Sequence, residues 1–141
     1  IIAKTQWAKF GLTICYDLRF PNLYRHLAQA GASVLVVPSA FTLATGKKHW
    51  HALLRARAIE TGAFVVAPAQ TGNHPGNRQT YGHSLIVSPS GEVLSDGGTA
   101  VGVTFADIDV EKVESARNEI PALKHDRIYK LDIIESIPKK K

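Results

Sequence analysis

The stretch that decides the fold is Phe10-Gly11-Leu12-Thr13-Ile14-Cys15-Tyr16-Asp17-Leu18-Arg19-Phe20-Pro21. Its first half has the residue types of a β-strand, in which alternate side chains face opposite sides. The bulky residues Phe10, Leu12 and Ile14 then share one side, and Cys15 falls on the other. The pattern therefore predicts a strand over residues 10–15 that ends at the only cysteine of the chain.

Two interpretations of Cys15 follow from this position. Ligands of α/β sheets bind beyond the strand ends, and a thiolate is a strong side-chain nucleophile near neutral pH. The alternative is a structural cysteine, because free cysteine is among the most buried residue types. The nucleophile hypothesis needs partner residues from elsewhere in the chain.

The segments that follow Cys15 alternate between helix and strand patterns. We expect helices over 21–30 and 49–61 and strands over 33–38 and 64–68. Both strands are continuous apolar runs, which are typical of buried strands covered by helices. This order predicts βαβ units and an α/β fold.

The pattern changes after residue 70. We expect a polar loop over 71–80, a strand over 83–88, a hairpin return at 93–94, a strand over 101–108 and a helix from Asp109 to about 118. Residues 121–141 have a mixed pattern and are predicted to form an extended tail. No linker or repeat divides the sequence, so residues 1–141 are predicted to belong to a single domain.

Composition narrows the class of protein. The 141 residues are 45% hydrophobic and 21% charged, an ordinary globular balance that argues against disorder. The net charge is +5, and Lys139, Lys140 and Lys141 contribute three of these charges. We interpret them as a solvated end and expect neither nucleic-acid nor membrane binding. A single cysteine permits no internal disulfide, which favours a reducing compartment, the cytoplasm.

The sequence shows no metal or cofactor motif. His49 and His51 lie two positions apart, which does not place them together on one helix face, and HExxH and CxxC patterns are absent. The glycines form neither a dinucleotide-binding nor a phosphate-binding pattern. We therefore expect no metal and no cofactor, and spacing alone selects none of the six histidines as a partner for Cys15.

Charged residues near the cysteine and on the second predicted helix have two interpretations. Arg57 and Glu60 are three positions apart and share a helix face, as a surface ion pair would. They could instead form a partly buried scaffold for the segment after Cys15. Asp17 and Arg19 likewise either orient that segment or face solvent.

Several motifs in order resemble the nitrilase superfamily, the carbon–nitrogen hydrolases. These are residues 11–21 around Cys15, His49-Trp50, residues 54–61, residues 64–70, Tyr81-Gly82-His83-Ser84, Ser88-Pro89-Ser90-Gly91 and residues 117–129. The resemblance covers about residues 7–129 and is closest to the Nit branch of amidases. That branch acts on ω-amides such as deaminated glutathione or α-ketoglutaramate.

The resemblance implies a chemistry. Cys15 matches the nucleophile that forms a thioester with the amide carbon, and the backbone N–H of Tyr16 matches an oxyanion donor. Phe41 and Thr42 match a loop that lines the substrate pocket, while Asp17, Arg19, Arg57 and Glu60 match positions interpreted as structural support. The implied activity is hydrolysis of a small carboxy-amide, with an N-carbamoyl amidohydrolase or a nitrilase as the alternative within the superfamily. The alternative outside enzymes is an inactive fragment or assembly module.

The family pattern also includes a glutamate base and a lysine well upstream of the cysteine. Only 14 residues precede Cys15, and neither Lys4 nor Lys9 matches the expected context. The sequence, which also lacks methionine, thus resembles the C-terminal half of a nitrilase-type enzyme and is expected to be inactive alone. The implied fold is an α-β-β-α sandwich, of which this chain supplies about half, and the implied assembly is a homodimer or higher homo-oligomer.

Overall fold

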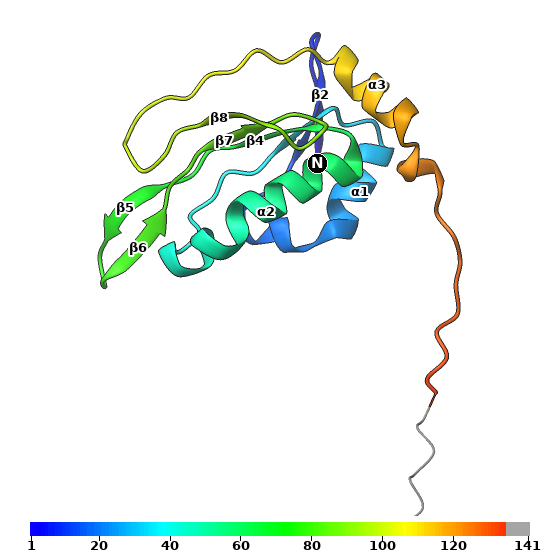
Figure 1. The fold of residues 1–141 in the computed structure, drawn as a ribbon. Coiled ribbons are helices and arrows are strands. Elements are labelled where there is room, and N and C mark those ends of the chain that lie inside the picture. Colours follow the sequence, from blue (N-terminus) through cyan, green and yellow to red (C-terminus); the bar gives the residue numbers. More distant parts are fainter. Residues whose placement is uncertain (135–141) are drawn as a thin grey trace, which may run out of the picture.

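The computed structural model describes residues 1–134, which form one main sheet and a separate hairpin (Figure 1). The strands of the sheet are, in spatial order, β1 (Ile2–Lys4), β2 (Lys9–Leu12), β3 (Val34–Val36), β4 (Phe64–Ala67), β7 (Leu85–Val87) and β8 (Val93–Asp96). Strands β2, β3 and β4 are parallel, whereas β1, β7 and β8 are added antiparallel. The short strand β1 is absent from the sequence-based prediction.

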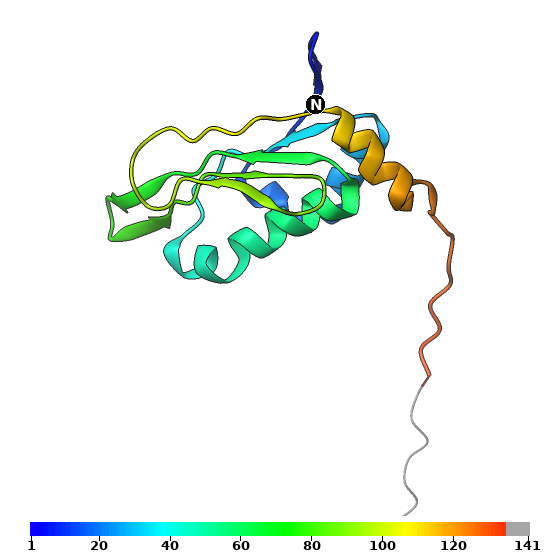
Figure 2. The same cartoon turned by 45° about the horizontal axis from the view of Figure 1, so that its top comes forward.

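Two helices make the parallel connections. Helix α1 (Pro21–Gln29) links β2 to β3, and helix α2 (Leu43–Thr61) links β3 to β4. Both lie on the same face of the sheet (Figures 1 and 2). The predicted α/β class and both βαβ units are confirmed.

The face under α1 and α2 holds the larger core. Leu35, Val65 and Val87 lie beside one another in register on neighbouring strands, and each is fully buried. Trp50 and Leu54 of α2 pack into the same cluster with no exposed surface. We call this side of the sheet the covered face.

The opposite side, which we call the open face, is buried at one end only. Val34 and Phe64 form a small cluster with Val113 of helix α3 (Glu111–Glu119). Farther along β2, Leu12 is 42% exposed and Ile14, just beyond the strand, 65%. The apolar run of β3 predicts that helices cover the whole strand on both sides. On the open face, helix α3 covers only one end of it.

The strand predicted over 10–15 is shorter than expected. Strand β2 ends at Leu12, and a 3-10 helix, η1 (Cys15–Arg19), begins three residues later. The Thr13 and Cys15 N–H groups still donate to the carbonyls of Val36 and Pro38. Pro38 has no N–H to continue the ladder toward β2, so the chain turns away there.

Helix α2 begins at Leu43, six residues before its predicted start at 49. Thr42 caps it, because its side-chain oxygen accepts a hydrogen bond from the Thr45 N–H. Gly46 permits close packing on β6, since a Cβ there would approach Tyr81 to 2.2 Å. The helix stops where predicted, at Gly62 with φ 55°.

The loop predicted over 71–80 is instead the hairpin of β5 (Thr71–His74) and β6 (Arg78–Tyr81). Its tip includes Gly76 and Asn77, with φ of 75° and 57°. Both residue types tolerate this left-handed conformation, so the polar composition fits a tight turn between strands.

The strand predicted over 101–108 is not formed. Residues 97–110 instead cross the open face without regular structure (Figures 1 and 2). Val101, Val103 and Phe105 are 94%, 79% and 81% exposed. The predicted helix after Asp109 is α3, and the Asp109 carboxylate accepts a hydrogen bond from the Glu111 N–H.

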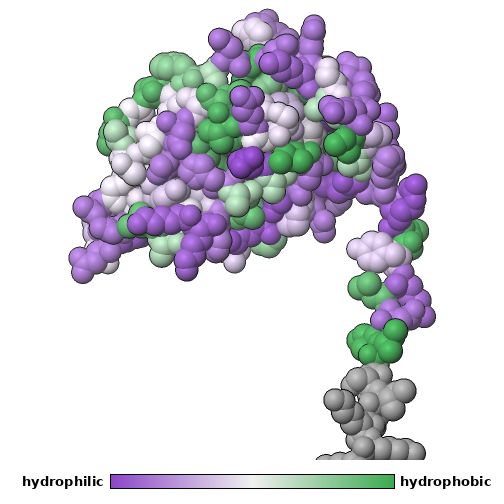
Figure 3. Space-filling model, in the orientation of Figure 1, coloured by the Kyte–Doolittle hydropathy of each residue, from purple (hydrophilic) through white to green (hydrophobic). Residues whose placement is uncertain are grey.

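After α3 a short 3-10 turn, η2 (Ala122–Lys124), precedes an irregular, exposed segment to residue 134. Figure 3 shows hydrophobic side chains along that segment as well as in patches on the body. Arg25 and Gln29 of α1 bind the Asp126 carboxylate. The rest of the predicted tail, including the three terminal lysines, lies outside the described residues. Over residues 1–134, no helix is both long and apolar enough to cross a membrane.

Candidate functional site

Cys15 lies just beyond the end of β2, at the first residue of η1. Its φ is 45°, a left-handed conformation that is uncommon for a residue with a side chain. Its N–H donates to the Pro38 carbonyl at 2.9 Å, which fixes the backbone against β3. Held strain of this kind is frequent at functional sites, so the geometry itself marks Cys15 as a candidate.

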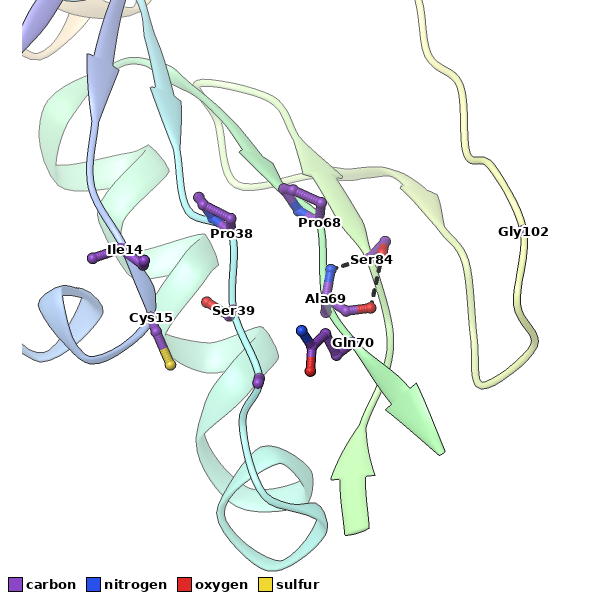
Figure 4. A pocket seen from close by; sticks show the side chains of 10 residues that line it. Ile14, Cys15, Pro38, Ser39, Pro68, Ala69, Gln70, Ser84 and Gly102 are labelled. Atoms are coloured by element: carbon purple, nitrogen blue, oxygen red, sulfur yellow. Dashed lines mark hydrogen bonds between the residues drawn. The ribbon is translucent and has the colours of Figure 1, made fainter. Parts of the chain in front are cut away.

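The half-buried Cys15 thiol lines a hollow of about 540 Å³ at the ends of β2, β3 and β4 (Figure 4). Its lining residues come from five segments of the chain: Ile14, Cys15, Pro38, Ser39, Ala40, Pro68, Ala69, Gln70, Ser84 and Gly102. The volume suits a small ligand. The predicted strand-end position of the cysteine thus coincides with a concave site.

The sequence analysis does not identify the polar residues that line this hollow. Ser39 and Gln70 each follow a strand and a proline, in Val-Val-Pro-Ser and Val-Ala-Pro-Ala-Gln. The Ser39 N–H donates to the Pro68 carbonyl and the Gln70 N–H to the Ser39 carbonyl, so the two segments stay side by side. The Ser84 hydroxyl accepts from the Ala69 N–H at 2.9 Å. The repeated pattern of a strand, a proline and a polar residue is the sequence signal that could indicate Ser39 and Gln70.

Arg57 ties helix α2 to the segment after the cysteine. It is only 5% exposed, and its Nε and Nη2 donate to the Leu18 carbonyl at 3.1 and 2.9 Å. Its Nη1 donates to Glu60 Oε1 at 2.7 Å. A surface ion pair does not describe this group; the contacts are those that the scaffold interpretation requires.

Asp17 and Arg19 lie on the same short helix as the cysteine. The Asp17 carboxylate accepts the Ile14 N–H at 2.9 Å, which closes the turn around Cys15. The Arg19 guanidinium lies over the Phe41 ring, 5.3 Å from its centre, and contacts His49 Nδ1 at 3.3 Å. Asp17 therefore holds the turn at Cys15, and Arg19 connects this short helix to Phe41 and to helix α2.

The remaining predicted site residues do not line the hollow. The ring of Phe41 is buried against Trp50, with ring centres 4.8 Å apart, and Thr42 caps α2. The Tyr16 side chain is 65% exposed. The pocket role of Phe41 and Thr42 and the oxyanion role of the Tyr16 N–H therefore stay predictions.

A buried hydroxyl pair lies beneath the site. The hydroxyl oxygens of Tyr24 and Thr13 are 2.8 Å apart, and the Thr13 hydroxyl also donates to the Val36 carbonyl. Burial raises the pKa of Tyr24 to about 12, although the hydrogen bond with Thr13 opposes the shift. Tyr24 is therefore neutral at physiological pH and joins α1 to the end of β2.

Among the described residues that line the hollow, Cys15 is the only one with an ionisable side chain. No histidine, carboxylate or lysine of residues 1–134 lines it with the thiol. A cysteine hydrolase needs a group that takes up the thiol proton and returns one to the leaving nitrogen. The described lining supplies a thiol without that group.

Comparison with known proteins supports the family resemblance that the sequence motifs indicate. The family model described as carbon-nitrogen hydrolase matches residues 1–118. A deaminated glutathione amidase of Synechocystis is 50% identical over 119 residues, which are 84% of this chain and 44% of that protein. The chain thus spans about half the length of the curated relatives it matches.

Solved structures agree with this assignment. Nit3 of Saccharomyces cerevisiae, a member of branch 10 of the nitrilase superfamily, matches with a TM-score of 0.84 and 37% identity over 91% of this chain and 47% of that one. An amidase from Nesterenkonia, captured with the acetamide moiety of fluoroacetamide on its active-site cysteine, has a TM-score of 0.71 and 27% identity, covering 86% and 46%. The chain therefore belongs to the carbon-nitrogen hydrolase family, within the nitrilase superfamily.

Proposed function

We propose that the protein hydrolyses the amide bond of a small carboxy-amide of the deaminated glutathione type, with Cys15 as nucleophile. The observation that carries the proposal is the thiol of Cys15 in the hollow at the strand ends, on a backbone with φ 45°. The relatives named deaminated glutathione amidase, 45–50% identical in Synechocystis and Dictyostelium, support the substrate class.

The proposed reaction has two steps. The Cys15 thiolate attacks the amide carbon, and the nitrogen leaves as ammonia or an amine after it receives a proton. Water then hydrolyses the thioester, which releases the carboxylic acid and restores the thiol. In the first step the backbone N–H of Tyr16 stabilises the negative charge that develops on the carbonyl oxygen.

The base and a further oxyanion donor must come from outside the described lining of the hollow. We propose that a glutamate and a lysine supply them from sequence beyond these 141 residues, as the family resemblance implies. The coverage of 44% of the Synechocystis relative supports this division. The 141-residue chain alone is then expected to be inactive.

The test measures amine or ammonia release by the complete protein and by the 141-residue chain. Substrates are deaminated glutathione, α-ketoglutaramate, an aliphatic nitrile and an N-carbamoyl amino acid. We expect the complete protein to favour the carboxy-amides and its Cys15→Ala variant to lose at least about a thousandfold in kcat. Mass spectrometry of a rapidly quenched reaction should find the acyl group on Cys15.

The outcomes separate the alternatives. Activity on the nitrile alone, or on the N-carbamoyl compound alone, would overturn the substrate class but keep the nucleophile. Full activity in Cys15→Ala would overturn the mechanism. A complete protein with no activity on any of the four compounds would favour the inactive assembly module.

We also propose that the protein forms a homodimer or higher homo-oligomer in the cytoplasm, and that it binds neither nucleic acid nor membranes. The resemblance to the nitrilase superfamily supports the assembly, and the single cysteine of these residues suits a reducing compartment. Light scattering of the complete protein tests the assembly. Salt-dependent DNA binding or vesicle binding would contradict the assignment of partners.

A further inference from the structure

A cluster of two histidines and an aspartate lies away from the cysteine hollow. His51 comes from the middle of α2, His83 from the segment between β6 and β7, and Asp96 from the end of β8. Their ligand atoms all lie within 4.8 Å of one another. None of the three lines the hollow that contains Cys15.

The distances inside the cluster are close to those of a metal site. His51 Nε2 is 3.0 Å from Asp96 Oδ2, and His83 Nδ1 is 2.9 Å from Asp96 Oδ1. Ligand atoms bound tetrahedrally to one zinc ion at about 2.0–2.1 Å stand roughly 3.3 Å apart. Two of the three pairs therefore need almost no movement, and the two imidazoles need to close by roughly 1.5 Å at most.

The side chains are held in place by their neighbours. The His83 ring stacks on Tyr81 with centres 4.3 Å apart, and the His83 carbonyl accepts from Trp50 Nε1 at 2.7 Å. The backbone of His83 has φ 58°, which is uncommon for a residue with a side chain. These contacts fix the position and orientation of the His83 ring.

The carboxylate is charged and anchored. The Gly98 N–H donates to Asp96 Oδ1 at 2.8 Å. Burial acts to raise the pKa of Asp96, but the hydrogen bonds from Gly98 and the two histidines outweigh it and lower the pKa. The carboxylate is therefore held where it contacts both imidazole rings.

We propose that His51, His83 and Asp96 form a binding site for a divalent first-row transition metal of the zinc class, separate from the cysteine hollow. Imidazole nitrogens favour Zn²⁺ and its neighbours over Mg²⁺ and Ca²⁺, which prefer oxygen ligands. Each neutral imidazole keeps its proton on the nitrogen that does not bind the metal. Three protein ligands leave a fourth position for water.

The bound metal would join three segments that are distant in sequence. His51 lies on the helix of the covered face, and Asp96 ends the antiparallel edge strand β8. A shared ion links α2 to the β7–β8 hairpin, so binding of Zn²⁺ raises the melting temperature of the chain.

The test is Zn²⁺ titration of the chain, followed by calorimetry, with no histidine tag and with Cys15→Ser to remove the thiol as a competing ligand. We expect one Zn²⁺ per chain. His51→Gln, His83→Asn and Asp96→Asn should each weaken binding by about a hundredfold or more, since even loss of a ligand's hydrogen-bond partner costs about 10- to 100-fold. His26→Gln, at an exposed position of α1, is the matched control and should bind as before.

Asn at position 83 tolerates the positive φ, and Asn at position 96 can still accept the Gly98 N–H, so these variants should fold. NMR of the histidine rings tests the site without these substitutions. Zn²⁺ should shift the signals of His51 and His83 and leave the signal of His26 unchanged. No Zn²⁺ binding, or binding that all three variants retain, would overturn the proposal.

Discussion

The covered and open faces of the sheet differ although the same strands form both. Leu35 of β3 points under the helices and has no exposed surface, whereas Leu12 of the adjacent β2 points to the open face and is 42% exposed. Two helices of 9 and 19 residues cover the first face. On the second face a 9-residue helix and an irregular segment cover only one end.

The difference shows how the candidate site is supported. Arg57 and Tyr24 hold the segment around Cys15 from the covered face, through buried hydrogen bonds to Leu18 and Thr13. From the other side, Ile14 and Gly102 line the hollow, and both are exposed. The structure thus fixes the cysteine backbone from the covered face and leaves the other side of the hollow open.

The sharpest test of this contrast exchanges the two leucines for alanine. Leu35→Ala should cost about 3–5 kcal/mol in the free energy of unfolding, because it opens a cavity in a buried core. Leu12→Ala should cost less than about 1 kcal/mol, since water already reaches that side chain. Urea unfolding measures both. Equal costs would mean that the open face is covered in solution.

The next largest effect is expected at Arg57. Arg57→Met should cost about 2–3 kcal/mol, because the buried Leu18 carbonyl loses both of its arginine donors. The matched control is Glu60→Gln, whose side chain is 41% exposed, and its cost should stay below about 1 kcal/mol. Urea unfolding compares the two variants. A larger effect at Glu60 than at Arg57 would show that the ion pair, not the carbonyl contact, stabilises the segment.

The sequence predicts the parts of this molecule that local pattern determines. The apolar runs of β3 and β4, and the helix pattern that precedes each of them, predict the βαβ units. The sequence-based prediction is wrong where tertiary contacts determine whether a strand or helix forms. Residues 101–108 alternate like a strand but find no ladder partner, and α2 starts early because Gly46 lets it pack on Tyr81.

In the candidate site, too, local pattern predicts some features and tertiary contacts determine the others. The strand-end cysteine was visible in the alternation of residues 10–15. The buried contact of Arg57 with Leu18 was not, because helix spacing reveals only its neighbour Glu60. The cluster of His51, His83 and Asp96 spans 45 positions and three elements, so no short motif indicates it.

The pH dependence of stability should show whether the Tyr24 hydroxyl on the covered face is shielded from water. Tyr24 has its pKa raised to about 12, so above pH 10 the unfolded chain loses this proton while the folded chain keeps it. Stability should then fall by roughly 2–3 kcal/mol as pH rises from about 10 to 12. The Tyr24→Phe variant is the control, and its stability should fall less over this range. Parallel pH profiles of the two proteins would show that water reaches the hydroxyl.

The smallest effect is expected on the segment that crosses the open face. Phe105 is 81% exposed, so Phe105→Ser removes almost no buried surface and should change the free energy of unfolding by no more than about 0.5 kcal/mol. Its buried counterpart is Phe64, 1% exposed, where Phe64→Ser should destabilise the chain far more. If Phe105→Ser costs as much as a buried phenylalanine, and the cost grows with protein concentration, then a second copy covers this segment and the open face is an interface. If the cost stays small at every concentration, the exposure is a property of the single chain, and the contrast between the two faces holds in solution.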